Sequence, residues 1–245
     1  MRFRDKVAIV TGGGGGIGLA VCHRLGAEGA RIVVAGRIPE RVQKAADDIK
    51  RGGAPDALGV VCDVSVEAQV EAAVDQTIQH FGRLDVVVNN AGVMLFKPIE
   101  ELTEQDWRNV LDVDLLGAVH FTKQAFLKMK SGGAIVNVAS IHAVMTSPLV
   151  APYAAAKAAL VSLTRSASIE GKAKGIRVNA VLPGAVDTPM LWDNPNVKSG
   201  AEKIDPKDVG KPEDLAAAIA FLASDDAAFV DGTALRVDGG RLDRL

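Results

Sequence analysis

The sequence predicts an α/β protein with a doubly wound sheet of about seven parallel strands and helices on both faces. Two observations predict this class. Short β-branched runs alternate with longer segments of helical periodicity along the whole chain. The short runs are apolar on both faces, which is typical of parallel strands that helices cover from each side. No low-complexity linker or short internal repeat interrupts the alternation, so residues 1–245 are expected to form a single domain.

The elements follow one another with little ambiguity. The predicted strands span Val7–Val10, Arg31–Ala35, Leu58–Val61, Leu84–Val88, Ala134–Val138, Arg177–Val181 and Ala234–Val237. The predicted helices cover residues 16–29, 39–51, 66–81, 103–130, 152–173 and 212–223. Pro39, Pro152 and Pro212 fall in the first turn of three of these helices, where a missing N–H costs nothing. The long stretch 183–233 has no strand, and its part from about 186 to 211 is expected to form an excursion that covers the substrate.

Composition argues against several classes of protein. With 48% hydrophobic and 24% charged residues, the 245-residue chain has the balance of a globular protein with a substantial core. A net charge of −2 offers no basic excess for nucleic acid or an anionic membrane, and no apolar run reaches transmembrane length. Cys22, Cys62 and the scattered histidines show no metal-ligand spacing. We therefore expect no metal, no nucleic acid and no membrane partner, and a location in the reducing cytoplasm.

A glycine-rich loop directly follows the first predicted strand and opens the first helix. It reads Thr11-Gly12-Gly13-Gly14-Gly15-Gly16-Ile17-Gly18. Glycines let the backbone turn sharply and approach a pyrophosphate, and the free N–H groups of a helix N-terminus attract that anion. A flexible linker is the alternative, but linkers do not lie between a buried strand and an amphipathic helix. The loop predicts a dinucleotide site on a Rossmann-type sheet.

The end of the second strand bears on the choice of cofactor. It reads Ala35-Gly36-Arg37, without the carboxylate that holds the ribose 2′-hydroxyl of NAD. A guanidinium pairs well with a 2′-phosphate, so NADP(H) is expected in preference to NAD(H), although Arg37 could also be a solvated surface residue. After the third strand, Asp63 and the adjacent Val64 are expected near the adenine; Asp63 could equally cap the next helix.

A tyrosine and a lysine share one helix face. Tyr153 and Lys157 are four residues apart, and an ammonium near a phenol stabilises the phenolate and lowers its pKa toward the range of general acid–base catalysis. Taken alone, such a pair occurs by chance on helices. Ser140 follows a strand at the same edge of the sheet, where its hydroxyl can bond a substrate oxygen. Asn89-Asn90-Ala91-Gly92 closes the preceding strand at that edge, although it could be an ordinary polar strand end.

Together these segments resemble the short-chain dehydrogenase/reductase family in its branch of roughly 250 residues. The resemblance rests on Thr11–Gly18 as TGxxxGIG, Asn89–Gly92 as NNAG, Ser140, Tyr153-x-x-x-Lys157 and Pro183-Gly184, and it covers essentially the whole chain. It implies that Tyr153 donates or accepts the proton, that Lys157 lowers the pKa of Tyr153 and binds the nicotinamide ribose, and that Ser140 orients the substrate oxygen. It further implies that the cofactor is lined by Gly12, Gly14, Gly15, Gly16, Ile17, Gly18, Asn90, Ala91, Gly92, Pro183, Gly184, Val186 and Thr188.

One position departs from the family pattern. Where the family usually has asparagine in its proton relay, this chain has Asp114, in register with Trp107, Leu111 and Ala118 on an apolar stripe. A buried carboxylate needs a partner or a proton, and the family geometry implies that Lys157 is close by. A working relay is expected, since the family draws much of it from the backbone carbonyl at this position. The alternative is a tolerated substitution with reduced turnover.

The resemblance implies an oxidoreductase that moves hydride between NADP(H) and a carbonyl or secondary alcohol. A 3-oxoacyl thioester, a sugar, a steroid-like ketone or a small cyclic alcohol would each suit it. His142 is expected at the substrate cavity, as a hydrogen-bonding group or as wall, and Met190 and Trp192 either cover the substrate or pack on neighbouring helices. The family also implies a homotetramer or homodimer through two long helices. A nucleotide-binding regulatory protein with little turnover is the alternative function, and an epimerase or dehydratase is disfavoured by length and glycine spacing.

Overall fold

The computed structural model describes residues 1–129, 132–200 and 202–244. Seven parallel strands form one sheet in the order β3-β2-β1-β4-β5-β6-β7. Their bounds are β1 Val7–Thr11, β2 Arg31–Gly36, β3 Ala57–Val61, β4 Val86–Asn89, β5 Gly133–Val138, β6 Ile176–Pro183 and β7 Ala234–Val237. The predicted fold class is thus confirmed. The strand order reverses direction between β1 and β4, and such a switch point opens a crevice at the carboxyl ends of the strands.

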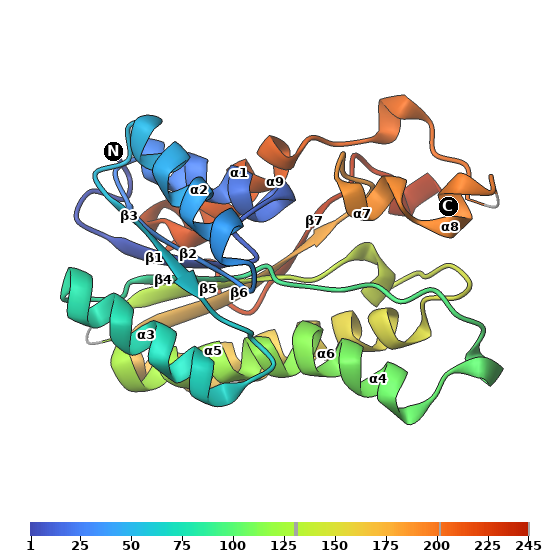
Figure 1. Cartoon of the computed structure of the whole chain (residues 1–245), viewed down its shortest axis with the longest axis horizontal. Helices are drawn as coiled ribbons and strands as arrows, with labels where there is room; N and C mark the ends of the chain where they lie inside the picture. Colours follow the sequence, from blue (N-terminus) through green and yellow to red (C-terminus); the bar gives the residue numbers. More distant parts are fainter. Residues whose placement is uncertain (130–131, 201, 245) are drawn as a thin grey trace.

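Helices cover the sheet on both faces. Their bounds are α1 Gly16–Ala27, α2 Pro39–Arg51, α3 Glu67–Phe81, α4 Glu104–Leu111, α5 Gly117–Lys128, α6 Ala151–Gly171, α7 Pro189–Trp192, α8 Pro195–Lys198 and α9 Pro212–Ala223. Figure 1 shows α1, α2 and α9 on one face of the sheet and α3, α4, α5 and α6 on the other. The short helices α7 and α8 lie near the C-terminus and away from the N-terminal end. The excursion expected at about 186–211 therefore contains helical turns, with residue 201 outside the described part.

The core lies in two layers because successive strand residues point to opposite faces of the sheet. In β1, Ala8 and Val10 join the hydrophobic cluster under α1, α2 and α9, whereas Ile9 joins the cluster on the other face. All three are fully buried. The prediction of strands apolar on both faces holds for these central strands. It fails at β7, an edge strand of the sheet, where Leu235 is 36% exposed.

The helix predicted over 103–130 is divided. Thr103 caps α4 through a reciprocal pair of hydrogen bonds with Asp106, a π-helical turn spans Asp112–Leu116, and α5 follows. Residue 130 lies outside the described part of the chain. A π-turn widens the helix by one residue and is frequent at functional sites. Here it carries Asp114, which is 2% exposed.

Candidate active site

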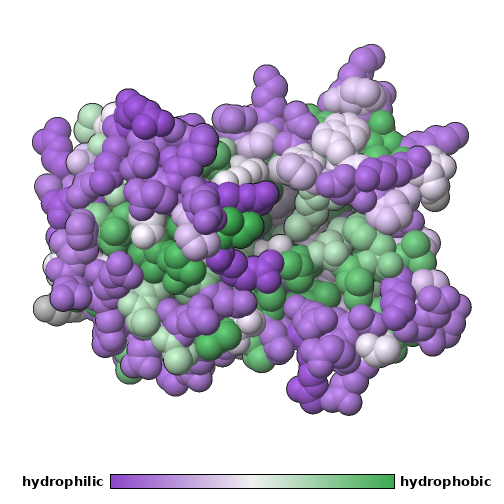
Figure 2. All heavy atoms as spheres, in the orientation of Figure 1, coloured by the Kyte–Doolittle hydropathy of each residue, from purple (hydrophilic) through white to green (hydrophobic). Residues whose placement is uncertain are grey.

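A cavity of about 490 Å³ lies at the carboxyl ends of the strands. In Figure 2 the surface is hollowed there, and hydrophobic residues form part of its wall. Of the residues singled out from the sequence, it is lined by Gly12, Gly14, Gly15, Gly16, Ile17, Arg37, Asn90, Ala91, Gly92, Ser140, His142, Tyr153, Lys157, Pro183, Gly184, Val186, Thr188 and Met190. The topology therefore gathers side chains from distant parts of the chain into one site.

The glycine loop forms the end of this cavity under α1. Gly12 has φ +64°, in the left-handed region that favours glycine. A Cβ at Gly18 would lie 2.4 Å from the carbonyl oxygen of Gly12, so the helix can approach the loop only because Gly18 has no side chain. At Gly15, the N-cap of α1, a Cβ would meet nothing within 4 Å, and no side chain caps the helix. The loop thus leaves open space beside free N–H groups at a helix N-terminus, which suits a phosphate.

Asn90 ties the glycine loop to the end of β4. Its side-chain amide donates to the carbonyl oxygen of Thr11 at 2.8 Å and, more weakly, to that of Gly12 at 3.4 Å. The backbone N–H groups of Asn90 and Ala91 both donate to the Thr11 hydroxyl at 2.9 Å. These bonds explain why polar residues close this strand: they hold the two central strand ends on either side of the crevice.

Arg37 lines the cavity beside the glycine loop, together with Gly36 and Arg41; a Cβ at Gly14 would lie 3.4 Å from the Cβ of Arg41. Among the described lining residues the single carboxylate is Glu202, on the excursion, so this part of the cavity offers cations and no acid. Asp63 lies near enough for the charge of Arg37 to act on it, but it does not line the cavity. The Asp63 carboxylate accepts from the backbone N–H of Ser65 at 3.0 Å and from its hydroxyl at 2.6 Å. These bonds form a local turn and do not cap the next helix, because the N-cap of α3 is Val66 and no side chain caps it.

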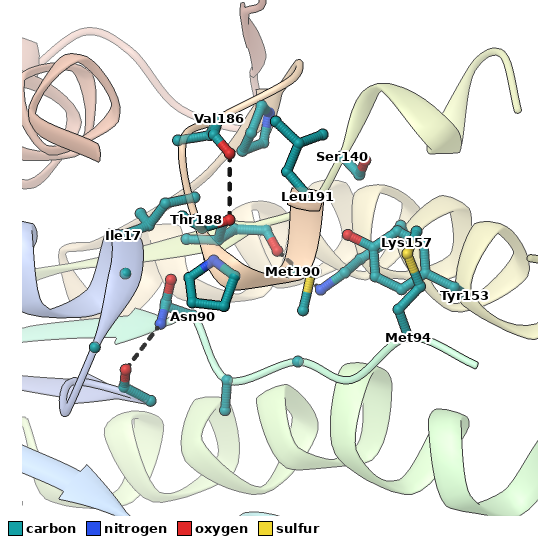
Figure 3. Close-up of a pocket in the computed structure, with 18 of the residues that line it drawn as sticks. Ile17, Asn90, Met94, Ser140, Tyr153, Lys157, Val186, Thr188, Met190 and Leu191 are labelled. Atoms are coloured by element: carbon teal, nitrogen blue, oxygen red, sulfur yellow. Dashed lines mark hydrogen bonds between the residues drawn. The ribbon is translucent and has the colours of Figure 1, made fainter. Parts of the chain in front are cut away.

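Tyr153 and Lys157 lie on α6 with both side chains buried, 7% and 3% exposed. The Lys157 ammonium is 5.4 Å from the centre of the Tyr153 ring and donates to the carbonyl oxygen of Val138 at 3.1 Å. Ser140, two residues after β5, is 5% exposed and also lines the cavity. Figure 3 shows Ser140, Tyr153 and Lys157 around one part of the site, with Met94 and Met190 close by. The arrangement brings a hydroxyl, a phenol and an ammonium to one cavity wall.

Asp114 reaches this group from the π-turn. Its carboxylate lies 3.1 Å from the Lys157 ammonium and accepts from the backbone N–H of Val93 at 2.8 Å. A Cβ at Gly92 would lie 2.9 Å from the same carboxylate, so glycine is needed there for the close approach. Asp114 does not itself line the cavity; it acts on the site through Lys157.

The pKa of Tyr153 differs from the expectation. Burial raises the pKa of the phenol; Lys157 and a hydrogen bond from Ser140 lower it, but the Asp114 carboxylate raises it again. The balance is a raised pKa, because burial penalises the phenolate and Asp114 offsets much of the nearby positive charge. Burial works against the charge of Lys157, yet the Asp114 carboxylate keeps the pKa of this ammonium above its usual range.

Four other predicted positions lie apart from the cavity wall. Gly18 packs beneath the loop, and Val64 is buried, with its carbonyl oxygen 3.0 Å from a ring nitrogen of His120. Asp63 is held in its turn with Ser65. Trp192, expected at the substrate, is 44% exposed, and its indole N–H donates to Asp187 at 2.7 Å, which turns it away from the cavity.

The cavity has further walls that the sequence did not reveal. Among them are Met94, Ile141, Asn194, Glu202 and Arg241. Leu191, between Met190 and Trp192, also lines the cavity. Glu202 and Arg241 carried no signal, because they are separated by 39 residues and meet only through the fold.

Two features are absent from the described ranges. No helix among residues 1–129, 132–200 and 202–244 is long and apolar enough to cross a membrane. Within the same ranges, no cluster of three or more histidine, cysteine, aspartate or glutamate side chains has the arrangement of a metal site.

Known proteins resemble this chain in sequence and in structure. A sequence model of the family described as enoyl-(acyl carrier protein) reductase matches residues 12–241. Meso-2,3-butanediol dehydrogenase of Serratia marcescens is 39% identical over 98% of this chain and 96% of its own length. Cis-4-hydroxycyclohexanecarboxylate dehydrogenase of Sinomonas cyclohexanicum is 42% identical over 97% of each chain. A crystal structure of levodione reductase matches with a TM-score of 0.93 at 36% identity and covers 100% of both chains.

The chain belongs to the short-chain dehydrogenase/reductase family. It is accordingly an oxidoreductase of alcohols or ketones, and the family uses a nicotinamide cofactor. The residues present fit such a cofactor in this dehydrogenase/reductase. Open space at Gly15 and the free N-terminus of α1 suit a pyrophosphate, and the cavity continues without interruption from Arg37 to Tyr153.

Proposed function

We propose that this dehydrogenase/reductase transfers a hydride between NADP(H) and a carbonyl or secondary alcohol, with Ser140, Tyr153 and Lys157 as its catalytic residues. One observation carries the proposal: the buried phenol of Tyr153 opens on a cavity whose wall also holds Ser140, with the Lys157 ammonium 5.4 Å from the ring. The nicotinamide ring supplies the hydride acceptor or donor when bound. The residues of this chain transfer the proton and orient the substrate.

Tyr153 moves the proton. In reduction its O–H donates to the carbonyl oxygen while the carbon gains a hydride, so an alcohol and a phenolate result. In oxidation the phenolate takes the hydroxyl proton as the hydride leaves the carbon. Ser140 holds the same substrate oxygen by a hydrogen bond, and the Lys157 ammonium stabilises the phenolate. The bond from Lys157 to the Val138 carbonyl oxygen fixes the ammonium beneath the ring.

Asp114 is a positioning residue in this proposal. Its carboxylate holds Lys157 from the side away from the cavity and is itself fixed by the backbone N–H of Val93. The same ion pair reduces the positive charge available to the Tyr153 phenolate. We therefore propose a working relay that prefers a more alkaline pH in the direction of oxidation than it would with an uncharged residue at position 114.

The cofactor proposal divides the cavity into three regions. Gly12, Gly14, Gly15, Gly16 and Ile17 would hold the pyrophosphate, with Gly18 allowing the close packing beneath them. Arg37 would pair with a 2′-phosphate, which favours NADP(H) because no carboxylate lines that end in the described residues. Asp63 and Val64 would lie beyond it, toward the adenine. The nicotinamide end would be held by Asn90, Ala91, Gly92, Pro183, Gly184, Val186 and Thr188.

The substrate proposal is a small secondary alcohol or the matching ketone. Apolar residues, among them Met94, Ile141, Met190 and Leu191, form much of the wall near Tyr153. The relatives named above act on a butanediol and on a hydroxylated cyclohexane ring, which supports a compact substrate. The His142 ring lies 5.8 Å from that of Tyr153, and its Nδ1 is 3.0 Å from the Thr146 hydroxyl. We therefore propose that His142 forms part of the wall of the substrate cavity and has a polar edge.

The test is absorbance at the band of reduced nicotinamide. NADP⁺ and NAD⁺ are offered separately with cyclic and linear secondary alcohols, and the reduced cofactors with the matching ketones, oxoacyl thioesters and sugars. Turnover of secondary alcohols or ketones with NADP(H) is the expected result. Binding of NADPH without turnover of any substrate would contradict the proposal and favour a nucleotide-binding regulatory protein.

We also propose that residues 1–245 act as one domain in a homotetramer or homodimer. Leu127 on α5 and Ile169 on α6 are 66% and 76% exposed, and contact with another copy would bury these apolar side chains. Light scattering of the purified protein tests this: a monomer at micromolar concentration would contradict it.

A further inference from the structure

Arg241 is held firmly in a turn just after β7. Gly239 and Gly240 have φ +60° and +75°, the left-handed values that allow the chain to reverse. The Asp238 carboxylate then accepts from the backbone N–H groups of Gly240 at 3.0 Å and Leu242 at 2.9 Å. These bonds fix the backbone on both sides of Arg241, so its side chain starts from a defined position.

The guanidinium of Arg241 is buried and yet lines the cavity. The residue is 8% exposed, and its guanidinium donates from Nη2 to Oε1 of Glu202 at 2.8 Å. No side-chain nitrogen of Arg241 is both fully enclosed and without a hydrogen-bond partner. Its remaining N–H groups therefore reach accessible space, and the cavity is the space that this side chain lines.

Several hydrogen bonds hold Glu202 in place. Besides Arg241, its carboxylate accepts from the Ser147 hydroxyl at 3.4 Å, and its backbone N–H donates to the carbonyl oxygen of Asn196 at 2.8 Å. Arg241 and Glu202 thus form an electrically balanced pair, in which these contacts use one of the five N–H groups of the guanidinium and two of about four acceptor positions of the carboxylate. A carbonyl or hydroxyl oxygen gains a hydrogen bond there. A carboxylate would in addition be repelled by Glu202.

The pair lies on the substrate side of the catalytic tyrosine. Ser147 belongs to the loop that follows Ser140, and both charges act on His142, whose ring is 5.8 Å from that of Tyr153. At the other end of the cavity, Arg37 and Arg41 line the nucleotide region. Arg241 is therefore placed to meet a part of the substrate distant from the reacting carbon.

We propose that Arg241 binds an uncharged carbonyl or hydroxyl oxygen of the substrate, remote from the reacting carbon, and that Glu202 sets the preference for this group over a carboxylate. The substrate class is then a diol, hydroxyketone or diketone. This inference rests on the proposed function, because it assigns the second contact of the same substrate.

The test compares three alcohols under the same conditions: cyclohexanol, a cyclohexanediol (the 1,3 and 1,4 isomers) and 4-hydroxycyclohexanecarboxylate. The wild-type chain should show a kcat/KM at least about tenfold higher for one diol than for cyclohexanol, the size of effect expected of a hydrogen bond to a charged group. Arg241→Gln should reduce that ratio by about tenfold or more, chiefly by raising KM for the diol. Arg236→Gln is the matched control, since Arg236 precedes the same turn, pairs with Asp243 at 2.6 Å and does not line the cavity.

Glu202→Gln provides a second, independent measurement, which also serves if Arg241→Gln fails to fold. Loss of the carboxylate should raise kcat/KM for 4-hydroxycyclohexanecarboxylate relative to the diol. An unchanged diol preference in Arg241→Gln, no gain for the carboxylate in Glu202→Gln, or a wild-type preference for the carboxylate over both diols would each overturn the inference while leaving the proposed function standing. No turnover of any alcohol by the wild-type chain would overturn both.

Discussion

The Lys157 ammonium lies 3.1 Å from the Asp114 carboxylate, and both side chains are buried beneath the cavity. Burial makes an isolated charge costly, so each of the two needs the other. The pairing has a consequence for the tyrosine one helical turn away. Part of the positive charge that would stabilise its phenolate is neutralised, and burial together with Asp114 holds the pKa of Tyr153 above its ordinary value.

Asp114→Asn should move the pH profile of the reaction to lower pH. Oxidation needs the phenolate of Tyr153, so its rate rises with pH as the phenol loses its proton. Without the Asp114 carboxylate the phenolate is repelled less, its pKa falls, and the rise occurs at lower pH; in reduction, which needs the phenol, the alkaline loss also moves to lower pH. The measurement is kcat/KM against pH in both directions. Asp112→Asn on the same π-turn is the control, and an unmoved or alkaline-shifted profile in Asp114→Asn would contradict the explanation.

Tyr153→Phe should abolish turnover and leave cofactor binding nearly intact, because the phenolic proton is needed only in the chemical step. A positioned general acid–base group contributes ~10²–10⁴-fold to the rate. Steady-state kinetics and NADPH fluorescence titration on the same preparation separate the two effects. Tyr153 is the single tyrosine of the sequence. More than about a tenth of wild-type turnover in the variant would remove Tyr153 from its assigned role.

Arg37→Asp should shift cofactor preference from NADP toward NAD. The substitution removes the proposed partner of the 2′-phosphate and supplies a carboxylate for a ribose hydroxyl. The ratio of kcat/KM for NADP over NAD should fall roughly ten- to a hundredfold, the range for charge-assisted hydrogen bonds. Arg51→Asp, at the far end of α2, controls for the change in net charge. An equal ratio in Arg37→Asp and wild type would make Arg37 a surface residue without a role.

Gly18→Ala should destabilise the fold even without cofactor. The new Cβ would lie 2.4 Å from the Gly12 carbonyl oxygen, and backbone cannot yield as a flexible side chain does. Overpacking of this kind costs ~1–3 kcal/mol of the free energy of unfolding, which urea denaturation of the ligand-free protein would show. Gly14→Ala is the matched control, because a Cβ there makes an ordinary 3.4 Å contact with the Cβ of Arg41. Equal stability of the two variants would contradict the close-packing role of Gly18.

Local chemistry was sufficient for most of the architecture. Alternating β-branched runs and helical periods predicted every strand of the sheet, because both patterns arise within a few residues along the chain. Glycines between a buried strand and a helix, and a tyrosine and lysine one turn apart, are local as well. These two local patterns correctly indicated the glycine loop, Tyr153 and Lys157 as lining residues of the cavity. The local signal was weak for Trp192, which was expected at the substrate. In the structure its indole N–H donates to Asp187, and the residue does not line the cavity.

Tertiary structure decided what depends on distance across the fold. The sequence marked Asp114 as a buried departure from the family pattern, but only packing shows that its carboxylate meets Lys157 directly and that burial outweighs the lysine in setting the pKa of Tyr153. Glu202 and Arg241 come from the excursion and from the segment after β7, and no periodicity relates them. They form a pair because a buried guanidinium requires a partner, and the folded chain brings one carboxylate within 2.8 Å of it.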